Sequence, residues 1–133
     1  MSGDSGRMPL RSEQDIVLAR QAVRQVALQL KFSLVDQTKM VTAASELARN
    51  ALVYGGGGDM DWTVLREGTR TGLRLAFVDQ GPGIPDLALA LTDGWTSGHG
   101  LGLGLSGTRR LVNEFELHSA PGEGTRVVIT RWK

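Results

Sequence analysis

A chain of 133 residues with 41% hydrophobic and 22% charged residues has the size and composition of one globular domain. A net charge of +1 gives no general attraction to nucleic acid or to an anionic membrane, and the absence of cysteine excludes disulfides and thiol catalysis. No apolar run approaches the ~20 residues of a membrane span, and no secretory signal is recognisable. We therefore expect a cytoplasmic domain with neither nucleic acid nor membrane as a partner.

The first predicted elements are two helices. We expect residues 1–10 to be a disordered lead and residues 11–133 to be a single domain. Ser12 and Ser33 are each followed three residues later by Asp, which is the pattern of a helix N-cap. Apolar residues at helical spacing follow each cap, and the second helix is predicted to end near residue 53, before four consecutive glycines.

The remainder of the chain is predicted to be mainly β-structure. Residues 60–67 and 72–79 read as an antiparallel hairpin, followed by a short helix from Asp86. A glycine-rich segment leads into a helix over residues 105–115, and the tail reads as strand, turn, strand. This order predicts an α+β fold, a two-layer sandwich with helices packed on one face of a mostly antiparallel mixed sheet.

The stretch SELARN, near the end of the second predicted helix, carries a polar cluster. Glu46 and Asn50 are four residues apart, so they share one side of the helix. On its own the cluster fits two interpretations. It is either a solvated helix face with a Glu–Arg contact or a face that holds a charged ligand, and a partner motif is needed to decide.

The stretch VDQGPGIPD provides such a partner. Asp79 ends an apolar strand, and Gly81 and Gly83 follow it at alternate positions, where they would let the backbone approach a ligand closely. A carboxylate at a strand end can accept a hydrogen bond from an amino group such as that of adenine. The alternative is a loop with a solvated carboxylate.

A third motif, GHGLGLGLSGTRR, places several glycines ahead of a helix, where backbone N–H groups form a cradle for phosphate. A dinucleotide-binding turn is rejected because no strand precedes it, and a Walker A loop is rejected because no lysine lies between Lys39 and Lys133. A fourth motif, GEGT at residues 122–125, reads by itself as an ordinary hairpin turn.

In chain order, these motifs resemble the nucleotide-binding boxes of the GHKL ATPase superfamily, which includes DNA gyrase, MutL, the ATP-driven chaperones and sensor histidine kinases. The resemblance spans roughly residues 35–131. It implies the Bergerat ATP-binding fold, with ATP and Mg²⁺ as cofactors.

The resemblance also implies a role for each matching residue. Asn50 would coordinate Mg²⁺, and Glu46 would be the catalytic general base for the attacking hydroxyl. Asp79 would accept a hydrogen bond from the adenine amino group. Arg49 would either contact phosphate or brace Glu46, and bracing is the favoured role. The other residues that would contact ATP are Gly81, Gly83, Gly100, Leu101, Gly102, Leu103, Gly104 and Thr125.

Within the superfamily, the sequence is most similar to the anti-sigma-factor group of serine/threonine protein kinases, and in particular to switch kinases of the bacterial stressosome. We expect no transducer domain and no phospho-accepting helical hairpin in a chain of this length. The resemblance implies a kinase that phosphorylates STAS-domain scaffold proteins and, when released, activates a metal-dependent serine/threonine phosphatase. The alternatives are an anti-sigma factor that sequesters a sigma factor and phosphorylates its STAS-domain antagonist, or a module that holds nucleotide without turnover.

Overall fold

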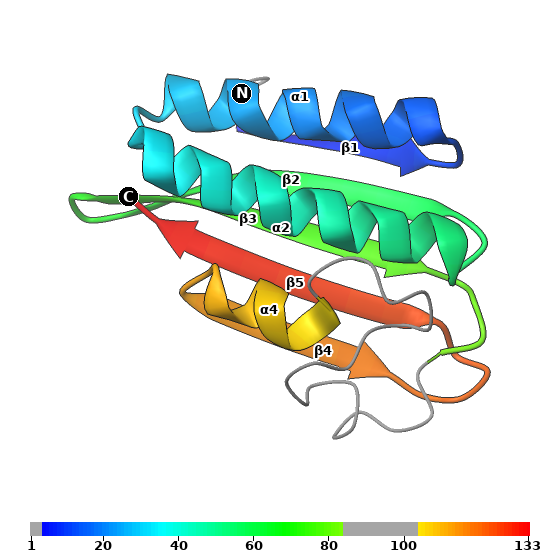
Figure 1. Cartoon of the computed structure of the whole chain (residues 1–133). Coiled ribbons are helices and arrows are strands. Elements are labelled where there is room, and N and C mark those ends of the chain that lie inside the picture. Colours follow the sequence, from blue (N-terminus) through cyan, green and yellow to red (C-terminus); the bar gives the residue numbers. More distant parts are fainter. Residues whose placement is uncertain (1–3, 84–103) are drawn as a thin grey trace.

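The computed structural model describes residues 4–83 and 104–133, and in these residues helices cover one face of a five-stranded sheet (Figure 1). The helices are α1 (Glu13–Gln29), α2 (Leu34–Val53) and α4 (Gly104–Arg110). The strands are β1 (Ser5–Leu10), β2 (Gly58–Glu67), β3 (Arg70–Asp79), β4 (Glu114–Ser119) and β5 (Thr125–Trp132). The strand order is β1-β2-β3-β5-β4, and each of these neighbouring pairs is antiparallel. The predicted α+β two-layer sandwich is confirmed.

Both predicted helix starts are confirmed by their caps. The Oγ atom of Ser12 accepts a hydrogen bond from the N–H of Asp15 at 3.2 Å, and the Oγ atom of Ser33 accepts one from the N–H of Asp36 at 3.1 Å. Each cap satisfies a backbone donor that has no partner within its helix. The caps fix where α1 and α2 begin. The start of α2 in turn determines which of its residues lie in its C-terminal turns.

The core lies between the helices and the sheet. Strand alternation turns Leu73, Leu75 and Phe77 of β3 toward the helices, where each is buried. Small residues of α2, such as Ala44 and Ala48, are fully buried and let the helix approach the sheet closely. Among residues 4–83 and 104–133, none of the helices combines the length and the apolar character that crossing a bilayer requires.

The expected disordered lead over residues 1–10 is wrong for residues 5–10, because Ser5–Leu10 form the edge strand β1. Met8 packs against the core and Leu10 is fully buried, whereas Arg7 on the other side of the strand forms an ion pair with Asp61 of β2. The alternation was hidden by a composition rich in Ser, Gly and Pro, and an edge strand tolerates proline.

The predicted helix over residues 105–115 is also too long, because α4 ends at Arg110 and Phe115 lies in β4. Phe115 pairs with Ile129 of β5 and packs against the core. Pairing with a strand distant in sequence therefore overrides the local helical pattern. The short helix expected from Asp86 lies outside the described residues.

Candidate active site

A pocket of about 100 Å³ lies between the C-terminal part of α2, the start of α4 and the adjoining ends of β3 and β5. Its lining residues are Leu47, Asn50, Ala51, Tyr54, Gly55, Phe77, Asp79, Pro82, Gly83, Leu105, Thr125 and Val127. Four of the predicted site residues thus lie together in this pocket: Asn50, Asp79, Gly83 and Thr125. Asn50 and Thr125 are nevertheless far apart in the chain. Antiparallel pairing causes part of this, because it sets Asp79 directly opposite Thr125.

Asp79 is the most distinctive polar group of this pocket. Its Oδ1 atom accepts a hydrogen bond from the N–H of Gly81 at 2.9 Å. Burial raises the pKa of the Asp79 carboxyl, while backbone hydrogen bonds from Gly81 and Thr125 act in the opposite direction. The two backbone donors orient the side chain as an acceptor, and its remaining lone pairs can accept a hydrogen bond from a ligand.

Glycines let three chain segments pack tightly around Asp79. A Cβ atom on Gly55 would collide with the side chain of Asp79, and a Cβ atom on Gly81 would lie 2.6 Å from the Cα atom of Gly55. Gly83 has φ of +80°, and a Cβ atom there would collide with the carbonyl of Ala120. Gly83 lines the pocket, whereas Gly81 acts through its N–H on Asp79.

Glu46 does not line this pocket. It lies one helical turn before Asn50 and lines a separate hollow of about 310 Å³ between the outer surfaces of α1 and α2. Arg20 and Arg24 of α1 line the same hollow. The expected bracing of Glu46 by Arg49 is not found, because Arg49 forms an ion pair with Glu13 of α1 at 3.3 Å.

The predicted phosphate loop is only partly described. Gly100, Leu101, Gly102 and Leu103 lie outside the described residues. Gly104 begins α4 with φ of +68°, and its carbonyl accepts a hydrogen bond from Oγ1 of the buried Thr108 at 3.0 Å. Gly104 itself is buried, and the next residue, Leu105, lines the pocket. The start of α4 therefore borders the pocket directly after the predicted loop.

The sequence interpretation missed the apolar walls of the pocket. Phe77 precedes Asp79 by two residues and Val127 follows Thr125 by two, so strand alternation places each apolar residue beside a polar one on the same face. That spacing was the available signal. Tyr54, at the C-cap of α2, was also missed and lines the pocket.

Comparisons with known proteins agree with this geometry. The family described as histidine kinase-, DNA gyrase B- and HSP90-like ATPase matches residues 35–133. The serine/threonine-protein kinase RsbT of Bacillus subtilis is 43% identical over 129 residues, which is 97% of each chain. An anti-sigma F factor of Clostridium novyi is 29% identical over 137 residues, covering 98% of this chain and 96% of that one.

Among solved structures, the RsbU and RsbW domains of a Mycobacterium tuberculosis protein superpose with a TM-score of 0.68 at 19% identity. The match covers 96% of this chain and 31% of that longer one, and at this identity it shows the fold. The chain belongs to the histidine kinase-, DNA gyrase B- and HSP90-like ATPase family. Within that family it is similar, over nearly its whole length, to a small serine/threonine kinase.

Proposed function

We propose that this protein is a Mg-ATP-dependent serine/threonine protein kinase. The observation that carries the proposal is 43% identity to a serine/threonine-protein kinase over 97% of both chains. The pocket supports it, because an oriented carboxylate among apolar walls suits a purine with an amino group at its edge. Family membership alone would not identify the reaction, since one fold hosts many activities.

ATP fits the residues that are present. Asp79 would accept the hydrogen bond of the adenine amino group, and the adenine ring would lie against apolar side chains such as Phe77 and Val127. The crowding at Gly55 and Gly81 leaves no room for side chains around the carboxylate. The start of α4, with Gly104 and the preceding loop, would hold the phosphates by their backbone N–H groups.

Mg²⁺ is proposed to bind through Asn50. This ion commonly takes one or two protein oxygens and fills its other positions with phosphate oxygens and water. No cluster of three or more His, Cys, Asp or Glu gathers among residues 4–83 and 104–133, which suits an ion held mainly by the nucleotide. When bound, the ion would neutralise charge on the phosphates during transfer.

Glu46 is proposed to act as general base. It would take the proton of a serine or threonine hydroxyl as the hydroxyl oxygen bonds to the γ-phosphorus and ADP departs with the former bridging oxygen. Glu46 and Asn50 are one turn apart on α2 but open onto different hollows. The protein substrate would therefore approach over the α1–α2 surface, while the nucleotide occupies the pocket beside β3 and β5.

The proposed substrates are serines or threonines of STAS-domain scaffold proteins, and the proposed second partner is a metal-dependent phosphatase that the released kinase activates. The similarity to RsbT supports this part of the proposal. A second candidate is an anti-sigma factor that sequesters a sigma factor and phosphorylates its STAS-domain antagonist. The similarity to anti-sigma F factor favours this candidate, although at 29% identity rather than 43%.

Phosphotransfer from radiolabelled ATP to a purified STAS-domain protein tests the kinase proposal. Glu46→Gln is expected to bind Mg-ATP nearly as well as the wild type and to lose transfer by about 10²-fold or more. Glu13→Gln is the matched control, since Glu13 is exposed and forms an ion pair with Arg49 at the surface. A transfer rate of Glu46→Gln close to wild type would remove Glu46 as the base.

A pull-down against sigma factors and STAS-domain proteins separates the two partner assignments. Retention of STAS-domain protein and phosphatase, without sigma factor, supports the switch-kinase proposal. Stable capture of a sigma factor with ADP or ATP present would favour the anti-sigma assignment instead.

A further inference from the structure

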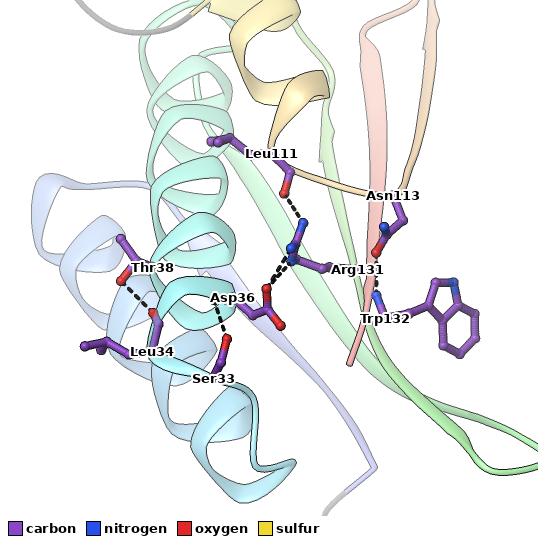
Figure 2. A network of polar contacts seen from close by, with 8 residues as sticks. All are labelled: Ser33, Leu34, Asp36, Thr38, Leu111, Asn113, Arg131 and Trp132. Carbon is purple, nitrogen blue, oxygen red and sulfur yellow. Dashed lines mark hydrogen bonds and ion pairs between the residues drawn. The ribbon is translucent and has the colours of Figure 1, made fainter.

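Arg131, near the C-terminal end of β5, contacts the start of α2 and the residue that follows α4 (Figure 2). Its Nε and Nη2 atoms donate to Oδ1 of Asp36 at 3.1 and 2.6 Å, and its Nη1 atom donates to the carbonyl of Leu111 at 2.9 Å. The Arg131 and Asp36 side chains are 16% and 22% exposed, so the pair is partly shielded from water. One guanidinium thus links β5, the first turn of α2 and the residue that follows α4.

The segment after α4 has further attachments to β5. The N–H of Asn113 donates to the carbonyl of Thr130 at 2.9 Å, and Oδ1 of Asn113 accepts from the N–H of Trp132 at 2.7 Å. Together with the bond from Arg131 to Leu111, these contacts tie the end of α4 to the end of β5. The Leu111 carbonyl belongs to the helix end, where carbonyl groups lack partners within the helix.

The same three elements reach the pocket at their other ends. β5 supplies Thr125, six residues from Arg131, and α2 supplies Asn50, fourteen residues from Asp36. Each separation corresponds to about 20 Å, from the rise per residue of a strand or a helix. α4 spans only seven residues, so Leu111 and the pocket residue Leu105 are separated by about 9 Å of helix rise. A helix this short is not stable alone and depends on such anchors.

We propose that Arg131 is a positioning residue for the nucleotide site: by fixing the end of α4 against α2, it sets where the start of α4 meets the phosphates. The proposal rests on the proposed function. Arginine is required because its planar group reaches the Asp36 carboxylate and the Leu111 carbonyl together. A lysine has one charged nitrogen and does not hold both acceptors in this fixed geometry.

The test compares ligands that do and do not reach α4. Under the proposed function, adenosine would contact only the base end near Asp79, whereas ATP would also reach the start of α4. Arg131→Lys is expected to bind ATP about 5–10-fold more weakly than wild type while keeping its affinity for adenosine. A purely structural role would lower the melting temperature and leave the ratio of the two affinities unchanged.

Affinities are measured by calorimetry at a temperature where circular dichroism shows every variant to be folded. The matched control is Arg7→Lys, because Arg7 pairs with Asp61 on the β1–β2 side, away from α2 and α4. Asp36→Asn removes the negative charge of the other partner and weakens the bridge, and it is expected to change the ATP-to-adenosine ratio in the same direction. If Arg131→Lys does not fold, the ratio of ATP to adenosine affinity in Asp36→Asn decides whether the positioning role holds.

An unchanged ratio in the folded variants would overturn the positioning role, as would failure of both variants to fold, which would make the network a requirement of the fold itself. Failure of the wild type to bind ATP is a different result, because it refutes the proposed function. Wild-type ATP binding with an unchanged ratio in Arg131→Lys refutes only this inference.

Discussion

Replacing Asp79 with asparagine should separate nucleotide affinity from stability. In the wild type, the carboxylate accepts the N–H of Gly81 at 2.9 Å and keeps acceptor capacity for the adenine amino group. Asparagine can still accept from Gly81 through its carbonyl oxygen, but its NH₂ group then faces the amino group of the base. The variant loses a charge-assisted bond of about 1.5–3 kcal/mol, which corresponds to a loss of affinity of about 10–100-fold.

The effect on stability should be small and should depend on pH. Burial raises the pKa of Asp79, so its ionised form costs folding free energy. This group's contribution to stability is fully present below the pKa of the unfolded chain and is lost as the pH rises through the folded pKa. Asp79→Asn removes this cost but weakens the backbone hydrogen bonds from Gly81 and Thr125, so the free energy of unfolding at neutral pH should change by no more than about 1 kcal/mol. The free energy of unfolding of the wild type should rise relative to that of the variant as the pH falls toward about 4.

Calorimetric titration with ATP and with ADP measures the affinity, and urea unfolding at several pH values measures the stability. ATP and ADP should lose affinity alike, because the proposed contact is to the base and not to the γ-phosphate. Asp61→Asn is the matched control, since Asp61 pairs with Arg7 outside the pocket and should leave nucleotide binding unchanged. Wild-type affinity for both nucleotides in a folded Asp79→Asn variant would refute the assignment of Asp79 to adenine.

Three further predictions follow from the same pocket. GTP should bind at least ~10-fold more weakly than ATP, because guanine would place a carbonyl acceptor opposite the Asp79 acceptor; equal affinities in calorimetry would contradict this. Asn50→Ala should weaken ATP binding when Mg²⁺ is present and leave metal-free ADP binding nearly unchanged, so an equal loss after chelation would argue against a metal ligand. Gly83→Ala should lower the free energy of unfolding by more than about 1 kcal/mol relative to Gly68→Ala in urea titrations. Both glycines have positive φ, but only at Gly83 would a Cβ atom meet another chain segment, at Ala120, so equal losses would show that the close approach does not matter.

Local signals in the sequence were enough for several elements. The caps at Ser12 and Ser33 act over three residues, and both were predicted. Interactions over so few residues leave a recognisable pattern in consecutive residues of the sequence. The hairpin of β2 and β3 was predicted for the same reason, since its strands are adjacent in sequence and alternate in character.

Elements that depend on distant pairing were predicted less well. β1 exists because it pairs with β2 more than forty residues later, and its short, glycine- and proline-containing sequence gives little sign of this. Phe115 continues a helical pattern, but its pairing with Ile129 places it in β4. In both cases the gain from burying side chains against a remote strand outweighs the local preference.

In the candidate site, too, some features were predictable from the sequence and others depend on the tertiary structure. The sequence by itself was enough to predict that Asn50, Asp79 and the nearby glycines belong to nucleotide-binding motifs, because the residues of each motif lie within a few positions of one another. Tertiary structure alone decided that Asn50 lines the pocket while Glu46, one helical turn earlier, lines the hollow between α1 and α2. It alone also joined Arg131 to Asp36, which are 95 residues apart. Such contacts depend on how helices lie on the sheet, and their free energy is gained only when the whole layer has packed.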